Sequence, residues 1–239
     1  MIISHSRQFI LLSPWKTASS TCHETLGSLN EGEYSRFFHW NPKLSRVVHQ
    51  HMTLADVLAL PEGRLGYRLC TFVRNPYDRA YSGFLQIRRD FEKQEPVASF
   101  SPSWIGDLVR AQVAENTARI VQAGYDFDRW LQNLPEYEIY EPGRNTNLVL
   151  HPAHYWTHVE GAKRVDFVGK VEQFNQDLAR LCDYVGVDRP AVVSANISGD
   201  GPPREERGYR YTDRMSRRTL DRINALFAAD FDYFGYPML

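Results

Sequence analysis

The sequence predicts an α/β fold, in which a mainly parallel sheet is flanked by helices within a single domain of 239 residues. Short apolar runs at 9–12, 69–73 and 164–169 have the length and composition of buried strands. Each run is followed by a stretch of helical character, and this alternation is typical of parallel sheets joined by crossover helices. The chain is also long enough to bury one sizeable core.

The first half of the chain alternates strand and helix. Thr53 and Asp56 have the spacing of a capping box, which predicts a helix start there. Pro76 suits the first turn of the helix that follows the third strand. The predicted elements are strand 9–12, helix 22–29, strand 46–51, helix 54–60, strand 69–73 and helix 76–89.

The second half is predicted to be helical on either side of one further buried strand. Gly124 interrupts the helical character of residues 107–134, and Gly186 is expected to end the helix that follows strand 164–169, because glycine is favoured just beyond a helix. The last helix is predicted to start near Thr212. The other predicted elements are strand and loop at 138–150 and a helix at 171–185.

Composition restricts the class of protein. Hydrophobic residues make up 43% and charged residues 24%, as in ordinary globular proteins, and a net charge of −1 argues against a general nucleic-acid binder. No apolar stretch approaches the roughly 20 residues of a membrane span, and no signal-peptide segment precedes Phe9. Cys22, Cys70 and Cys182 are odd in number and lack metal-ligand spacing, which favours free thiols. We therefore expect a cytoplasmic protein without a transmembrane segment.

The polar turn between strand 9–12 and the following helix is a candidate anion site. A strand that turns directly into a helix directs several backbone N–H groups at one point, with the helix dipole behind them. Lys16 adds a full positive charge, and hydroxyl donors follow at Thr17, Ser19, Ser20 and Thr21. The alternative is an ordinary polar turn and helix start with a solvated lysine.

Two further residues follow predicted strands. Lys16, His51 and Arg74 each lie just beyond a strand end, and ligands of parallel α/β sheets bind beyond the carboxyl ends of the strands. We therefore expect these three side chains to converge on one edge of the sheet. Taken singly, an arginine after a strand is more typical of a surface ion pair, and a strand histidine of a structural residue.

Four motifs resemble one enzyme family. Lys16-Thr-Ala-Ser-Ser-Thr21 resembles the 5′-phosphosulfate loop of sulfotransferases that use 3′-phosphoadenosine 5′-phosphosulfate (PAPS), although Trp15 separates Pro14 from Lys16 where the family usually has Pro-Lys-Thr. The segment 74–82 resembles their 3′-phosphate loop, in which an arginine and a serine eight residues later bind the 3′-phosphate. The segments 166–172 and 231–236 are similar to the carbohydrate branch (family 2), which includes heparan sulfate 2-O-sulfotransferase. The resemblance leaves about 90–145 unmatched.

The resemblance implies a P-loop-like sheet and one sulfotransferase domain over 1–239, with an acceptor-side insertion at about 90–160. It implies PAPS as the sulfuryl donor, no metal, and a hydroxyl acceptor on a carbohydrate such as a glycan or glycolipid. A basic loop before the last helix closes over the nucleotide in related enzymes. The implied donor-binding residues are Lys16, Thr17, Ala18, Ser19, Ser20, Thr21, Arg74, Ser82, Arg204 and Arg207.

The segment His49-Gln-His51 matches a His-x-His of the heparan 2-O enzyme, whose second histidine is the catalytic base. The resemblance thus implies His51 as the base, with His49 the next candidate, and residues i and i+2 of a strand project from one face. Sulfuryl transfer is an in-line displacement like phosphoryl transfer, so positioning and charge stabilisation should dominate catalysis. Lys16 is expected to stabilise charge on the departing oxygen.

The sequence leaves three other interpretations open. A P-loop kinase or nucleotidase would need Gly-x-x-x-x-Gly-Lys-Ser/Thr, and no such glycines precede Lys16. A catalytically silent relative would only bind nucleotide or glycan. His151, His154 and His158 offer a superficial metal set, but Pro152 disrupts the helix that would align them, so an acceptor-side loop is preferred. Trp104, Trp130 and Trp156 could stack on sugars, with at least two expected in the core.

Overall fold

The computed structural model describes residues 1–34, 37–93, 103–140, 150–192 and 211–239. The chain forms two compact units. Unit 1 comprises Met1–Phe37, Asn41–Arg74 and Ala153–Gly208, and unit 2 comprises Phe38–Trp40, Asn75–Pro152 and Tyr209–Leu239. The expected mixed α/β fold with a mainly parallel central sheet is confirmed, and that sheet lies in unit 1.

The central sheet has the strand order β1-β2-β5-β8. The strands β2, β5 and β8 are parallel, with Leu12 opposite Thr71 and Val73 opposite Lys170. The antiparallel edge strand β1, paired to β2, was not predicted. These strands are β1 (Ile2–Ser4), β2 (Phe9–Leu12), β5 (Arg68–Val73) and β8 (Phe167–Lys170).

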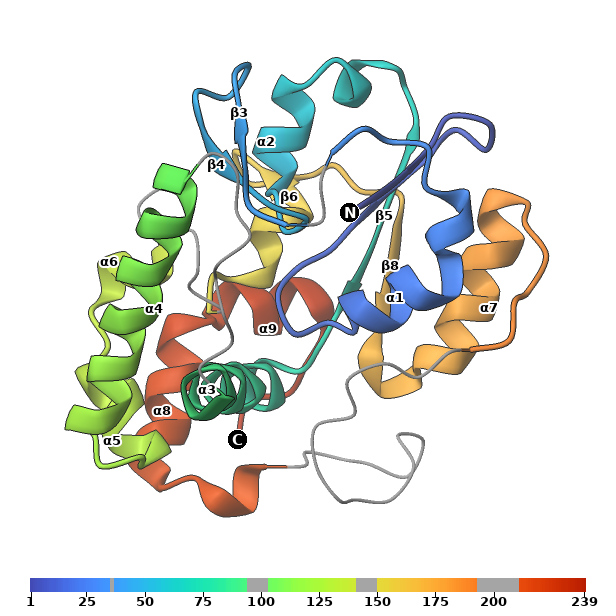
Figure 1. Cartoon of the computed structure of the whole chain (residues 1–239). Helices are drawn as coiled ribbons and strands as arrows, with labels where there is room; N and C mark the ends of the chain where they lie inside the picture. Colours follow the sequence, from blue (N-terminus) through green and yellow to red (C-terminus); the bar gives the residue numbers. More distant parts are fainter. Residues whose placement is uncertain (35–36, 94–102, 141–149, 193–210) are drawn as a thin grey trace. The chain divides into compact units, whose positions relative to one another are not determined.

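Strand β2 is buried on both faces, as parallel strands usually are. Because successive side chains of a strand point to opposite faces, Phe9 and Leu11 pack into one apolar cluster while Ile10 and Leu12 pack into another. Helices α1 (Ser19–Leu26) and α7 (Phe174–Val185) cover the first face, and α2 (Leu54–Ala59) covers the second (Figure 1). Packing on both faces holds β2 in place, and with it the start of the β2–α1 loop.

Other elements of unit 1 are short. The capping box predicted at Thr53 is present, since Thr53 Oγ1 accepts from the Asp56 N–H and the Asp56 side chain accepts from the Thr53 N–H. Gly186 ends α7 in the left-handed conformation, at φ 72°, as predicted. Strand β3 (His39–Asn41) spans the boundary of the units. The remaining strands are β4 (Arg46–Val48), β6 (His158–Val159) and β7 (Ala162–Lys163).

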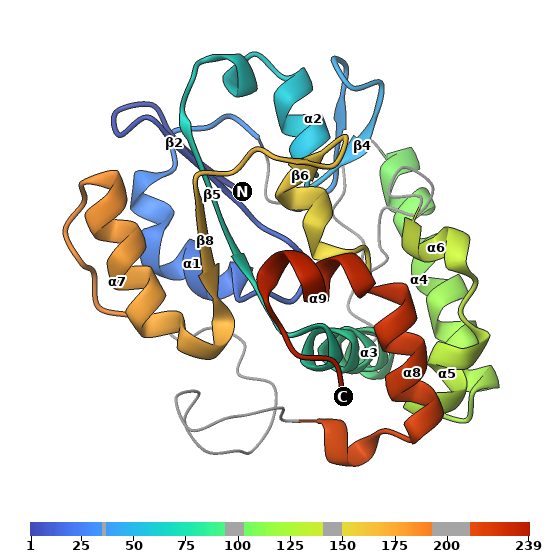
Figure 2. The same ribbon diagram turned by 180° about the vertical axis from the view of Figure 1, so that it is seen from behind.

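Unit 2 is helical, and Figure 2 shows α8 running alongside α5. Aromatic rings of Tyr81, Phe84, Phe127 and Trp130 pack together between its helices. The single last helix expected near Thr212 is instead two helices, α8 and α9, and residues 138–140, expected as strand, belong to α6. The helices are α3 (Pro76–Lys93), α4 (Ser103–Gln122), α5 (Phe127–Asn133), α6 (Glu136–Tyr140), α8 (Arg217–Leu226) and α9 (Ala228–Phe234).

Candidate functional site

The β2–α1 loop has an unusual backbone. Lys16 and Ala18 both adopt left-handed conformations, at φ 62° and 63°, with Thr17 at negative φ between them. Alternating signs of φ are typical of backbone turns that bind anions through successive N–H groups, and a left-handed conformation costs a residue with a Cβ about 1 kcal/mol or more. Buried Thr17 stabilises the turn, because its Oγ1 donates to the Pro14 carbonyl at 2.9 Å.

Helix α1 begins at Ser19, three residues before the predicted start at Cys22. Its N-cap is Ala18, which has no side-chain oxygen and so makes no capping hydrogen bond to the first turn. Ser19, Ser20 and Thr21 therefore lie in that turn rather than in the preceding loop. The positive end of the helix dipole therefore lies next to the loop of residues 16–18.

The two histidines are held in opposite tautomers. His51 Nδ1 lies 2.6 Å from the carbonyl oxygen of Ser13, and since a carbonyl only accepts, Nδ1 carries the proton and Nε2 the lone pair. The backbone N–H of His51 donates to Nδ1 of His49 at 3.0 Å, so a neutral His49 carries its proton on Nε2. Only His51 therefore presents an unprotonated Nε2.

The environment keeps the His51 ring neutral. The side chain is buried, and burial holds the pKa of His51 well below its ordinary value of 6.5. The adjacent His49 lowers the pKa further, while the hydrogen bond to Ser13 opposes both effects. No described residue hydrogen-bonds to Nε2 of His51.

His49 and His51 are close together, but not because they project from one face of a strand, as predicted. Strand β4 ends at Val48, so His49 and His51 are not on one strand, and the expected alternation of strand faces is wrong here. A turn brings the rings to a centroid distance of 5.2 Å. Strand β4 is also outside the central sheet, and His51 reaches the β2–α1 loop through Ser13 instead.

The carboxyl ends of β2 and β5 do lie at one edge of the sheet, because the strands are adjacent and parallel. Arg74 directly follows β5 and is half-buried. Within the described part of the chain, its guanidinium has no ion pair or hydrogen bond. Ser82 is a buried residue of α3 in unit 2. Arg204 and Arg207 lie outside the described residues.

The comparisons with known proteins decide the family. The model of the sulfotransferase family matches residues 1–237. The chain belongs to the sulfotransferase family. It is thus a transferase of sulfuryl groups, and its resemblance to the carbohydrate branch falls within that family. No curated protein and no solved structure matches it.

Residues between Arg74 and Ser82 fix the start of α3 in this sulfotransferase. The side-chain oxygen of Asn75 accepts from the N–H of Tyr77 at 2.9 Å, which satisfies an open donor of the first turn. Asp78 accepts from the backbone N–H of Tyr211 at 3.2 Å. These contacts lie within unit 2 and assign the motif's interior a structural role.

The same motif holds a buried ion pair. Arg79 is fully buried, with Nη2 at 3.3 Å from Asp230 and Nη1 donating to the His151 carbonyl at 2.7 Å. The guanidinium also lies 5.1 Å from the centroid of Phe227. A buried pair of this kind is strongly destabilising to break, because the remaining charge is left without compensation.

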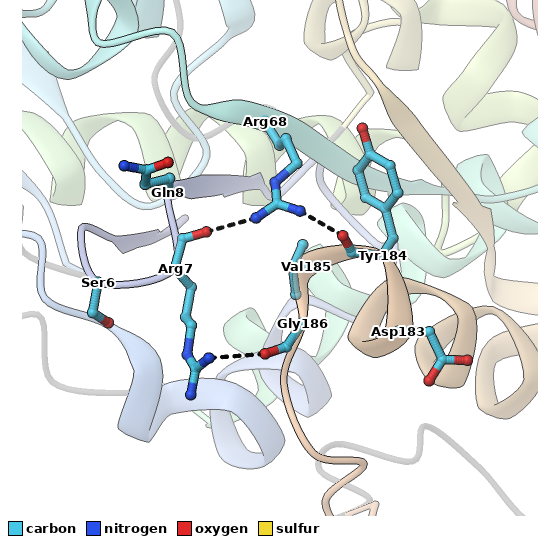
Figure 3. A pocket seen from close by; sticks show the side chains of 8 residues that line it. All are labelled: Ser6, Arg7, Gln8, Arg68, Asp183, Tyr184, Val185 and Gly186. Atoms are coloured by element: carbon cyan, nitrogen blue, oxygen red, sulfur yellow. Dashed lines mark hydrogen bonds between the residues drawn. The ribbon is translucent and has the colours of Figure 1, made fainter.

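One open cleft in unit 1 lies away from the carboxyl edge. Its volume is about 430 Å³, and it is lined by Ser6, Arg7, Gln8, Arg68 and residues 183–186 (Figure 3). Arg68 and Arg7 donate to the carbonyls of Tyr184 and Gly186, at 2.6 and 3.0 Å. These arginines therefore cap the C-terminus of α7, whose carbonyls lack helical partners.

The structure also describes the candidate metal ligands, the tryptophans and the cysteines. Among the described residues, no group of three His, Cys, Asp or Glu side chains is placed to hold a metal ion. Trp130 and Trp156 are core residues, whereas Trp104 is exposed and contacts exposed Trp40 within unit 2. The three cysteines are free and buried. No helix in the described ranges has the length and apolar character to cross a membrane.

Sequence reasoning missed the role of Trp15. Its indole stacks on the His51 imidazole, with ring centroids 3.9 Å apart and an interplanar angle of 21°. In the sequence Trp15 is visible only as a departure between Pro14 and Lys16, and the histidines lie more than 30 positions away. No pattern in the chain indicates that they meet.

Proposed function

We propose that this sulfotransferase moves the sulfuryl group of PAPS to a hydroxyl of a carbohydrate acceptor, with His51 as the general base. The observation that supports the base most directly is the hydrogen bond from His51 Nδ1 to Ser13, which leaves the lone pair on Nε2. A neutral imidazole with an available lone pair can accept a hydroxyl proton near pH 7.

The residues at the carboxyl edge suit the donor. The backbone N–H groups of residues 16–18, next to the positive end of the α1 dipole, would bind the terminal anionic group as a P-loop-like cradle, together with the first-turn hydroxyls of Ser19, Ser20 and Thr21. Arg74 suits the 3′-phosphate because guanidinium forms paired, charge-assisted hydrogen bonds and no described residue neutralises it. Ser82, Arg204 and Arg207 stay donor-binding candidates on the strength of the family resemblance alone.

Bound PAPS would supply an activated sulfuryl group whose bond to a phosphate oxygen is weak enough to break. His51 takes the acceptor's proton at Nε2 as the acceptor oxygen becomes nucleophilic. Lys16 stabilises the negative charge that develops on the departing oxygen. A sulfuryl group carries one negative charge, fewer than a γ-phosphate, so a lysine and oriented N–H groups suffice for charge stabilisation without a metal.

His49 has a different task from His51. Its Nδ1 is occupied by the His51 backbone N–H, so in the neutral ring Nε2 is a donor and not a base. We assign His49 to hydrogen bonding with the oxygens of the reacting groups and to fixing the backbone of His51. This division predicts that the two histidines are not interchangeable.

A nucleotide titration separates the proposed enzyme from a P-loop kinase. Calorimetry should detect tight binding of 3′-phosphoadenosine 5′-phosphate without Mg²⁺, and much weaker binding of 5′-AMP, which lacks the 3′-phosphate. Equal affinity for both nucleotides, or a requirement for Mg²⁺, would instead support the kinase.

A turnover assay tests the reaction itself. The purified protein is incubated with ³⁵S-labelled PAPS and a panel of glycans, glycolipids, phenols and peptides, and sulfated products are resolved by mass spectrometry. We expect label on carbohydrate hydroxyls. Nucleotide binding with no labelled acceptor across the panel would favour a catalytically silent relative, and label on a phenol or peptide alone would reject the carbohydrate acceptor.

A further inference from the structure

The three rings of Trp15, His49 and His51 form one contact group. Trp15 lies nearly parallel to His51 at 3.9 Å and edge-on to His49 at 5.1 Å, with an interplanar angle of 79°. The histidine rings meet each other edge-on at 5.2 Å. One indole therefore contacts both imidazoles, from a loop that also carries Lys16.

The backbone holds Trp15 in this position. Pro14 precedes it, and the Thr17 Oγ1 bond to the Pro14 carbonyl closes the turn around it. The left-handed Lys16 follows directly, and the half-buried indole packs against the apolar cluster that contains Ile10 and Leu12. The ring's location is thus set by both the turn and the core.

The indole and Ser13 restrain His51 in complementary ways. The Nδ1–H bond to Ser13 fixes one edge of the imidazole, and the indole covers one of its faces. A rotation of the imidazole about its bond to Cβ would break the stack and the hydrogen bond together. The covered face is also shielded from water, which would reach it if the indole were removed.

We propose that Trp15 is a positioning residue, which holds the His51 ring in the orientation where Nε2 meets the acceptor hydroxyl and joins it to the loop of Lys16. The catalytic part of this inference rests on the proposed function of His51, whereas the orientation of the ring does not. Because an angstrom of misplacement can cost up to about 10²-fold in rate, a side chain that never touches the substrate can control turnover.

Several charged or titratable groups also influence the His51 ring. His49 lies beside it, and His23 of α1 and the amino group of Met1 act on it electrostatically, each disfavouring a second positive charge. Lys16 is adjacent to Trp15 in the chain. A substitution at Trp15 leaves these residues in place, but His49 also contacts the indole. The His49 signals are therefore followed in the same spectra, and a change of tautomer at His51 reports the loss of the indole.

The test combines Trp15→Ala with Trp15→Phe, which retains an aromatic face, and Trp15→Leu, which retains apolar volume for the case where alanine fails to fold. Two-dimensional ¹H–¹⁵N spectra of the imidazoles give the tautomer and titration of His51 without any substrate, with His51→Gln used to assign its signals. We expect the native protein and Trp15→Phe to show the Nδ1–H tautomer and a low titration midpoint. In Trp15→Ala and Trp15→Leu the midpoint should rise toward 6.5 and the tautomers should mix.

Kinetics complete the test. In Trp15→Ala, kcat should fall by ~10- to 100-fold with little change in the KM for the nucleotide, and the acidic limb of kcat/KM should move to higher pH. Trp15→Phe should restore most of kcat. Unchanged imidazole spectra in Trp15→Ala would overturn the positioning role. Altered spectra together with full activity in His51→Ala would reject His51 as the base and the catalytic part of the inference, but not the orientation by Trp15.

Discussion

Arginines lie at both ends of strand β5, and they have different environments. Arg68 is the first residue of the strand and Arg74 directly follows its last, and both are half-buried. The guanidinium of Arg68 donates to the carbonyls of Tyr184 and Arg7, at 2.6 and 3.0 Å, and lies over the Tyr184 ring (Figure 3). In the described part of the chain, the guanidinium of Arg74 has no such partner.

The topology of a parallel sheet explains the difference. Helices that follow parallel strands begin at the carboxyl edge and end at the amino edge, as α1 and α7 do. Helix C-termini offer unpaired carbonyls, which accept from arginine, whereas helix N-termini offer N–H groups, which cannot. A cation at the amino edge is therefore satisfied by the fold, and one at the carboxyl edge is suited to an external anion.

The largest expected effect concerns the carboxyl edge. His51→Ala should lower kcat by ~10²- to 10⁴-fold, because a positioned base contributes about that much, while nucleotide affinity stays unchanged. Steady-state turnover and calorimetry measure the two quantities. His49→Gln is the matched variant and should lose less. Full activity of His51→Ala would transfer the role of base away from this residue.

The two arginines form a matched pair for binding. Arg74→Ala should weaken binding of 3′-phosphoadenosine 5′-phosphate by ~2–4 kcal/mol, since paired charge-assisted bonds to a phosphate are lost, and should abolish the preference over 5′-AMP. Arg68→Ala should leave nucleotide affinity unchanged. An equal loss of nucleotide affinity in both variants would show that the carboxyl and amino edges of the sheet do not differ in anion binding.

Stability should respond in the opposite order. Arg68→Ala removes two hydrogen bonds to backbone carbonyls and should lower the free energy of unfolding by ~1–2 kcal/mol in urea titrations. Arg74→Ala should cost less than about 0.5 kcal/mol, as for surface substitutions without partners. A larger loss in Arg74→Ala than in Arg68→Ala would indicate an unrecognised structural role for Arg74.

A further expected effect is on the pH dependence of stability. The pKa of His51 is lowered in the folded protein, so below pH 6.5 the unfolded chain binds a proton that the native protein does not. The free energy of unfolding should therefore fall as pH decreases from 6.5, by at most ~1.4 kcal/mol per pH unit from this residue. Urea titrations from pH 7.5 to 5 should show a shallower slope in His51→Gln, and identical slopes would contradict a neutral, buried ring.

Local patterns in the sequence were sufficient for several elements. Strand β2 has the predicted bounds, since a short, continuous apolar run is typical of a strand buried on both faces. The capping box at Thr53 and the glycine end of α7 were also predicted, because both depend on residues a few positions apart. The edge strand β1 was missed although it pairs with the neighbouring β2, because three residues are too few to show a strand pattern. The helix α6 was missed because its contacts, such as the bond from Tyr140 to the Leu226 carbonyl, are distant in the chain.

The sequence by itself determined the family motifs, the strand–helix alternation and the identity of Lys16, His51 and Arg74 as residues to examine. Only the tertiary structure decided which nitrogen of each histidine carries the proton, and that Trp15 covers His51. It also distinguished Arg74 from Arg68. Residue types are fixed by the chain, but hydrogen-bond partners and ring contacts depend on which distant segments the packed core brings together, and no local pattern encodes them.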